Sequence, residues 1–238
     1  MTKILKQQNF SREGRQKGFT LIEIAIVLVI IGLLLGGVLK GQELINTARV
    51  RALNSTVDGI TAAWFSFQDR YRGFPGDYAQ AAVNLPGVAT ANATNVGNGL
   101  VDTDEERGFV WTHLQAAGYI TGNYDGSAVG DDEYGCQVTT CPDNGFGAGM
   151  NLSYGDMQQA QTGIDAHELI TGRGIPVEVL AELDRKVDDG FAGTGAMQLG
   201  IDGTGWTGVV GSCQDANDSN LYGLQAPSAN CAAVFRNF

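Results

Sequence analysis

The feature that most constrains this chain is an uninterrupted apolar run near its start. Residues 19–39, FTLIEIAIVLVIIGLLLGGVL, contain one charged side chain, that of Glu23, and Lys40 ends the run. About 20 consecutive apolar residues can cross a bilayer as a helix, because a helix satisfies its backbone hydrogen bonds internally. We therefore expect a membrane-spanning helix here. A charged carboxylate in hydrocarbon costs about 2.5 kcal/mol or more, so Glu23 requires an explanation.

The segment before the run is polar and basic. Residues 1–18 contain five Lys or Arg side chains and one Glu. Basic flanks stay in the cytoplasm, which predicts that most of the chain lies on the other side of the membrane. A cleaved secretory signal would have a shorter apolar region and a small-residue cleavage site, and neither is found here. A simple membrane anchor remains possible but leaves Glu23 unexplained.

The segment KGFTLIE, Lys17 to Glu23, together with the apolar run, resembles the N-terminus of type IV pilins and of type II secretion pseudopilins. The resemblance implies that residues 1–18 are a leader peptide. A prepilin peptidase would cut between Gly18 and Phe19 and methylate the new N-terminus. The resemblance also implies that Glu23 pairs with the Phe19 amine of an adjacent subunit during assembly, since a buried charge needs an opposite partner.

One position departs from the pilin pattern. Many pilins have a proline near the end of the apolar run, where this chain has Lys40. Each glycine in a helix weakens it by roughly 1 kcal/mol relative to alanine, so local melting is still possible here. The glycines concerned are Gly32, Gly36, Gly37 and Gly41. The missing proline leaves open whether this is a major or a minor subunit.

The helix is predicted to continue beyond the membrane. Apolar residues recur at steps of three and four, which is one stripe of an amphipathic helix. The stripe is Leu53, Val57, Ile60, Trp64, Phe67 and Tyr71. Gly73, followed by Pro75, predicts the end of the helix. We expect residues 19–39 to form its transmembrane or filament-core half and residues 40–73 its amphipathic half.

Residues 74–238 are predicted to form a globular, loop-rich head, since glycine reaches 34 of 238 residues, about twice its usual share. Acidic residues at one helix start and a proline at another predict short helices over 105–117 and 176–184. Strands are predicted over 196–201, 208–211 and 232–235, with a weaker one over 152–154. The fold class is therefore α+β, a long N-terminal helix packed on a small antiparallel sheet.

All the cysteines lie in the head, at Cys136, Cys141, Cys213 and Cys231. An even number in this position predicts two disulfides in an oxidising compartment. Three pairings are possible, and the local one is preferred because it closes the shortest loops. The pilin resemblance adds that a loop closed by Cys213 and Cys231 is similar to the disulfide-bounded loop of many pilins. A zinc site is disfavoured because no CxxC pair supports it.

Charge is distributed unevenly along the chain. Residues 1–73 hold ten Lys or Arg and five Asp or Glu, whereas the rest holds five and 21. An acidic head argues against direct nucleic-acid binding, because phosphate contacts need a basic face.

The sequence predicts no enzyme. His113 and His167 are the only histidines, and Thr171 stands where an HExxH zinc motif would need its second histidine. The only cofactor considered is calcium, which binds carboxylate and carbonyl oxygens. Its candidate ligands lie in acidic loops without EF-hand spacing, and solvated loops are the preferred interpretation. These candidates are Asp102, Asp104, Asp131 and Asp132.

The leading functional hypothesis is a structural subunit of a type IV pilus-like filament, built with copies of itself or other pilins. The resemblance implies prepilin peptidase and an inner-membrane assembly machinery as partners. The precursor would be a single-pass inner-membrane protein with a cytoplasmic N-terminus, and the mature head would be periplasmic or extracellular. One alternative is a type II secretion pseudopilin. An alternative of another class is a membrane-anchored surface binding protein, which needs neither the Gly18–Phe19 junction nor Glu23.

Overall fold

The structure is a computed structural model that describes residues 18–88, 96–130, 136–157, 163–200, 213–215, 217–225, 227–236 and 238. Its contacts divide the chain between Leu44 and Ile45 into two compact units, which are described separately. The elements in chain order are α1 (Leu21–Tyr71), α2 (Ala81–Asn84), α3 (Asp104–Ala116), β1 (Asn151–Gly155), β2 (Ala166–Ile170), α4 (Val177–Val187), β3 (Met197–Leu199) and β4 (Ala233–Phe235).

The first unit contains the N-terminal part of α1. Every residue from 18 to 40 is exposed, including the large apolar side chains. By length and composition this helix is able to cross a membrane. Exposed apolar surface on this scale is costly in water, so it requires lipid or other helices around it.

The second unit begins with the rest of α1, whose apolar stripe packs into the core of the head. Five of the six predicted stripe residues are buried, and Tyr71 packs against the core while partly exposed. The helix ends at Tyr71, and Arg72 takes the left-handed conformation with φ of 54°. The prediction that Gly73 marks the end was therefore close, but the residue that turns the chain is Arg72.

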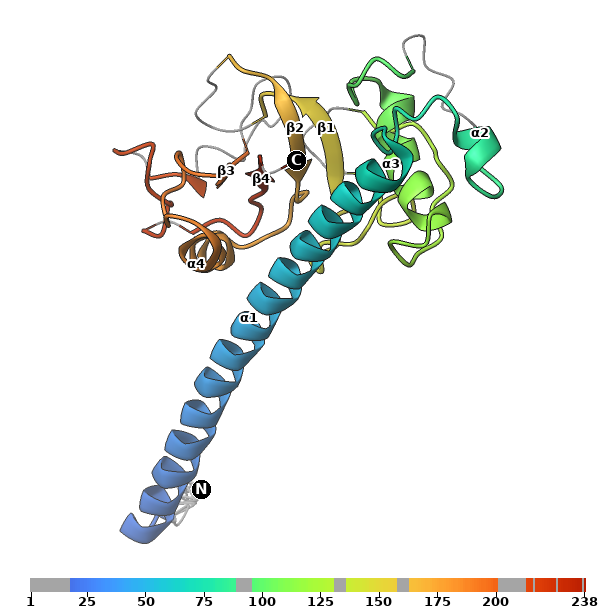
Figure 1. The fold of residues 1–238 in the computed structure, drawn as a ribbon. Coiled ribbons are helices and arrows are strands. Elements are labelled where there is room, and N and C mark those ends of the chain that lie inside the picture. Colours follow the sequence, from blue (N-terminus) through green and yellow to red (C-terminus); the bar gives the residue numbers. More distant parts are fainter. Residues whose placement is uncertain are drawn as a thin grey trace, which may run out of the picture. The chain divides into compact units, whose positions relative to one another are not determined.

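The head contains an antiparallel sheet of four strands in the order β1-β2-β4-β3 (Figure 1). In its register Leu152 lies opposite Leu169, and Ile170 lies opposite Val234. Strand β3 completes the sheet, with Gln198 paired with Val234. The predicted strand over 208–211 lies outside the described residues.

Strand β2 was not predicted. Its sequence, AHELI, contains His167 and Glu168, two polar residues that propensity places at the surface, yet both are buried. Glu168 accepts a hydrogen bond from the Met157 N–H and pairs with Arg236, and His167 packs among aromatic rings. The other strands lie where they were predicted, with bounds shifted by one or two residues.

Two short helices pack against the sheet, each in contact with a different strand. Helix α3 contacts β1, and helix α4 contacts β3. Thr103 caps α3 in a capping box with Glu106, and Pro176 stands at the N-cap of α4. Both helices were predicted, whereas the four-residue α2 was not.

Two disulfides close loops of the head. Cys136 pairs with Cys141 and Cys213 with Cys231, each with 5.8 Å between Cα atoms. This is the local pairing that the sequence favoured. The second disulfide joins Cys213 to the segment just before β4, and the backbone of Cys231 separately pairs with that of Ile175. The observed fold is thus α+β, with one long helix, a small antiparallel sheet and two disulfides.

Candidate functional site

The first turn of α1 is held by reciprocal hydrogen bonds between Thr20 and Glu23. The Thr20 backbone N–H donates to Glu23 Oε2 at 2.8 Å, and the Glu23 N–H donates to Thr20 Oγ1 at 3.3 Å. The Thr20 hydroxyl also donates to Oε2 at 2.8 Å. This arrangement is a capping box, which satisfies two backbone donors that the helix itself leaves free.

This role of Thr20 and Glu23 was not predicted, although T-x-x-E before an apolar run is the sequence signature of a capping box. The capping box explains how one isolated chain accommodates Glu23. The carboxylate remains exposed on the helix, together with the neighbouring Phe19, whose side chain is 83% exposed.

Gly18 stands directly before this first turn. A Cβ atom built there would meet nothing within 4 Å, so the fold does not require glycine at this position. Gly18 is exposed, as are Phe19 and Thr20. The Gly18–Phe19 peptide bond therefore lies in an open segment next to the helix start.

The family model described as the prokaryotic N-terminal methylation motif matches residues 14–39. This match spans the Gly18–Phe19 junction, the capping box and the apolar half of α1. The chain carries the signature of type IV pilins and pseudopilins. Comparison with curated proteins and with solved structures found no match.

The pilin signature is typical of structural proteins that are anchored in a membrane through such an exposed helix. Proteins with this motif are structural rather than enzymatic, and they assemble with the help of prepilin peptidase and pilus machinery. An apolar helix near the N-terminus, within a pilin motif, fits anchoring in the inner membrane. The head, residues 74–238, lies outside the matched segment.

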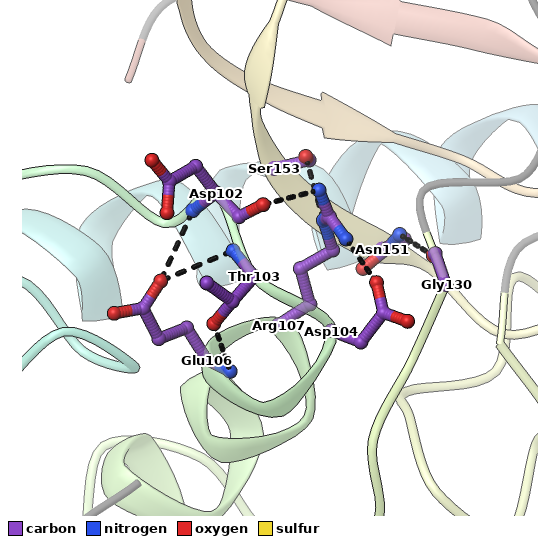
Figure 2. Close-up of polar contacts among 8 residues, drawn as sticks. All are labelled: Asp102, Thr103, Asp104, Glu106, Arg107, Gly130, Asn151 and Ser153. Atoms are coloured by element: carbon purple, nitrogen blue, oxygen red, sulfur yellow. Dashed lines mark hydrogen bonds and ion pairs between the residues drawn. The ribbon is translucent and has the colours of Figure 1, made fainter. Parts of the chain in front are cut away.

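Two of the acidic residues proposed as calcium ligands, Asp102 and Asp104, belong to a hydrogen-bond network around Arg107. Asp104 Oδ1 accepts a hydrogen bond from Arg107 Nη1 at 2.6 Å, and Arg107 Nη2 donates to the backbone carbonyl of Asp102 at 2.8 Å. Figure 2 shows the carboxylates of Asp102 and Asp104 on opposite sides of this network. Asp131 and Asp132 lie outside the described residues. Calcium binding by this set stays an untested prediction.

The network around Arg107 joins α3 to the sheet. Arg107 Nε donates to Ser153 Oγ on β1 at 2.9 Å, and the arginine side chain is buried (Figure 2). Glu106 Oε2 accepts from the N–H groups of Thr103 at 3.1 Å and Asp102 at 3.2 Å. Burial nevertheless raises the pKa of Glu106 above its ordinary value. These contacts assign a structural role to the segment 102–107.

The two histidines are packed among aromatic rings. The ring of His167 lies 4.7 Å from that of Phe74 and 5.2 Å from those of Trp64 and Tyr154. Burial lowers the pKa of His167 to about 4, so the imidazole is neutral at physiological pH. His113 Nδ1 accepts a hydrogen bond from the N–H of Gly76 at 2.9 Å. The segment that resembled a zinc motif is strand β2, so it does not form the helix that this motif requires.

A buried ion pair lies beside His167. Glu168 is fully buried, its Oε1 lies 2.9 Å from Arg236 Nε, and its Oε2 accepts from the Met157 N–H at 2.7 Å. Burial raises the pKa of Glu168 to about 7, although Met157 and Arg236 lower it. The folded chain therefore holds this proton more tightly than the unfolded chain.

This shift predicts that the free energy of unfolding falls as pH rises. The pKa of glutamate in an unfolded chain is about 4.3, so the folded state binds more protons between about pH 4.5 and 7. Stability from this group is present below that window and is lost as pH rises through 7. We expect the wild-type chain to lose about 2–3 kcal/mol over this range relative to Glu168→Gln.

The measurement is denaturant unfolding of the detergent-solubilised chain at several pH values. Glu182→Gln, on the surface of α4 in an exposed pair with Lys186, is the control and should keep the wild-type slope. Parallel curves for the wild type and Glu168→Gln would contradict the assignment.

Proposed function

We propose that this chain is a filament subunit of a type IV pilus or of a type II secretion pseudopilus, cut between Gly18 and Phe19 and methylated at Phe19. The observation that supports this most strongly is the methylation motif at residues 14–39, because the described apolar side chains of this segment, from residue 19 to 39, are all exposed. The filament supplies the apolar surroundings that the helix lacks in a single chain. The subunit is structural, and the proposal includes no catalysis.

The capping box suggests how Glu23 changes partner during assembly. In the isolated chain the carboxylate accepts hydrogen bonds from Thr20. Cleavage after Gly18 would create a charged amine on Phe19, one helical turn away. When helices stack, both charges leave water and the amine of one subunit becomes the partner of Glu23 in the next. The hydrogen bonds to Thr20 stabilise the ionised carboxylate until then.

The head has features expected of a protein outside the cytoplasm. Its four cysteines form two disulfides, which persist in oxidising compartments. The basic segment before the apolar run favours a cytoplasmic N-terminus by the positive-inside rule. The proposed precursor therefore spans the inner membrane once, with the head on the periplasmic side, and the mature head lies on the filament surface.

The test of processing is an intact mass of material sheared from cells, with N-terminal fragmentation. We expect a chain that starts at methylated Phe19 and lacks the four hydrogens lost in forming two disulfides. Gly18→Leu should keep residues 1–18 attached, because it changes the residue at the cleavage site, and a Cβ atom at this position meets nothing within 4 Å that would disturb the fold. A wild-type chain found only in membranes, with residues 1–18 in place, would favour the membrane-anchored binding protein instead.

The test of assembly is Glu23→Ala. We expect membrane insertion and cleavage to continue while sheared filaments fall to the detection limit, because the Phe19 amine then has no partner. Glu43→Ala is the matched control, since Glu43 is an exposed acid on the same helix in an ion pair with Lys40 at 2.6 Å. Normal filaments from Glu23→Ala, or equal loss from Glu43→Ala, would contradict the proposed pairing.

A strain that lacks this chain distinguishes a pilus from a secretion pseudopilus. Loss of surface pili would favour a pilus subunit, and loss of exported proteins would favour a pseudopilin.

A further inference from the structure

The loop closed by the second disulfide contains the segment DANDS at residues 215–219. Its last three residues form the triplet N-x-S, the pattern at which a glycan is attached to an asparagine side chain. Asp215 stands two residues before Asn217. An acidic residue in that place belongs to the longer pattern selected by bacterial enzymes of N-linked transfer, D/E-x-N-x-S/T. The segment matches this longer pattern in full.

The segment lies on the surface of the head, at the tip of a short hairpin. Gln214 pairs with Tyr222 across this hairpin. The Asp215 N–H donates to the Leu221 carbonyl oxygen at 2.9 Å, so the paired part ends just before the asparagine. All residues from 217 to 221 are exposed. An enzyme can therefore reach the tip without unfolding the head.

The hairpin is attached to the rest of the head on both sides of its tip. Cys213 is linked to Cys231, and the Cys213 carbonyl oxygen accepts from the Gly223 N–H at 2.8 Å. The Asn220 carbonyl oxygen accepts from the Ala192 N–H at 2.9 Å. These contacts use the backbone and the disulfide, so they hold the tip in a defined place and leave its side chains exposed.

The side-chain amide of Asn217 has no competing partner. Among the described residues, none forms a hydrogen bond with this amide, and only the Asn217 backbone N–H is engaged, donating to Asp215 Oδ1 at 2.9 Å. That contact holds the acidic side chain close to the backbone of the asparagine. The Asp218 carboxylate accepts from the Asn220 N–H at 2.9 Å. Both neighbouring acids thus bond the backbone, and the amide nitrogen of Asn217 stays open to reaction.

Four other N-x-S or N-x-T triplets occur in the chain, and in none of them does Asp or Glu stand two residues before the asparagine. Asn54 lies within α1, and its amide donates to a carboxylate one turn later at 3.0 Å. Asn151 is fully buried on β1, and its amide donates to the Gly130 carbonyl oxygen at 3.2 Å. The other two, at Asn9 and Asn92, lie outside the described residues. Within the described part of the chain, Asn217 alone combines the acid, the exposed position and the unpartnered amide.

From these observations we propose that Asn217 is a glycosylation site, modified by a membrane-bound transferase that uses an oligosaccharide on a polyprenyl diphosphate carrier. The Asn217 Nδ2 forms a bond to the anomeric carbon of the first sugar, and the bond from that carbon to the diphosphate oxygen breaks. The diphosphate leaves on its lipid with the bonding electron pair, and the amide gives one proton to a base of the enzyme. The Asp215 carboxylate offers a charge that a cationic group of the transferase can pair with. The inference rests on the proposed export of the head, where it would meet such an enzyme.

The test is peptide mass spectrometry of the full chain from the cells that produce it, with fragmentation that keeps a glycan on its side chain. We expect a glycan on Asn217 and none after Asn217→Gln or Ser219→Ala. Asp215→Asn keeps an oxygen that accepts the same backbone hydrogen bond but removes the charge, so glycan occupancy should fall by about tenfold, the order of one charge-assisted contact. Ser219→Thr and Asn54→Gln are the matched controls and should keep the glycan.

Two further readouts separate this test from misfolding and from failed export. The Asn217→Gln chain should melt at the temperature of wild-type chain treated to remove the glycan, since the side chain contacts no other described residue. In the same sample, the N-terminal peptide reports whether the chain begins at methylated Phe19. A chain that begins at Phe19 and carries an unmodified Asn217 would overturn the glycosylation proposal and leave the filament proposal standing. A glycan that persists in Asn217→Gln would also overturn it.

Discussion

Replacement of Trp64 by alanine is expected to destabilise the head by about 3–5 kcal/mol, the usual cost of removing a large buried aromatic side chain. Trp64 lies on α1, is fully buried, and contacts three rings from other parts of the fold. Its ring lies 5.3 Å from Phe74, 5.2 Å from His167 and 6.1 Å from Phe238. Alanine would leave a cavity where α1 now contacts His167 on β2 and Phe238.

Thermal unfolding of the detergent-solubilised chain measures this effect, and we expect the melting temperature to fall by about 10 °C. The neighbouring Phe65 is the matched control, because it stands on the same helix but is 46% exposed. Phe65→Ala should change stability by less than about 1 kcal/mol. Equal losses in the two variants would mean that the stripe on α1 does not form the core contact described here.

Replacement of Gly108 by alanine is expected to destabilise the chain by about 3 kcal/mol, although alanine is the better helix former. Gly108 lies on α3, where the backbone of a following loop passes directly against the helix. A Cβ atom at this position would lie 2.0 Å from the Ser127 carbonyl oxygen and 2.8 Å from its carbon. Backbone atoms cannot rotate away as a side chain can, so the helix and the loop would have to separate.

Gly59→Ala is expected to have the opposite effect on stability from Gly108→Ala. Gly59 lies on the exposed face of α1, and a Cβ atom there would meet nothing within 4 Å. The change should stabilise the chain by about 0.5–1 kcal/mol through helix propensity alone. Urea unfolding of the two variants should therefore give shifts of opposite sign. A stabilised Gly108→Ala would show that the loop does not pack against α3.

Local sequence patterns predicted the parts of this fold that depend on neighbouring residues. The step of three and four residues from Leu53 to Phe67 identified the buried face of α1, because helical geometry alone places those side chains on one side. Thr103 and Glu106 form a capping box that could have been read from the T-x-x-E pattern. The same pattern occurs at Thr20 and Glu23, where the structure shows the same reciprocal hydrogen bonds.

Contacts between distant residues could not be predicted in this way. Strand β2 contains polar residues that look exposed in sequence. The buried Glu168 carboxylate is stabilised by the Met157 N–H and by Arg236, which stands 68 positions after Glu168. Among the described residues, Asp184, Asp188 and Asp189 bring carboxylate oxygens within 4.8 Å of one another at the end of α4, and none of the three was a candidate chosen from the sequence.

The apolar helix, its pilin-type motif and the amphipathic stripe that follows can be predicted from sequence, because each depends on residues within a few turns of one another. The meeting of the acids, the pairing of the strands and the burial of Glu168 cannot, because they depend on where packing brings separate segments together.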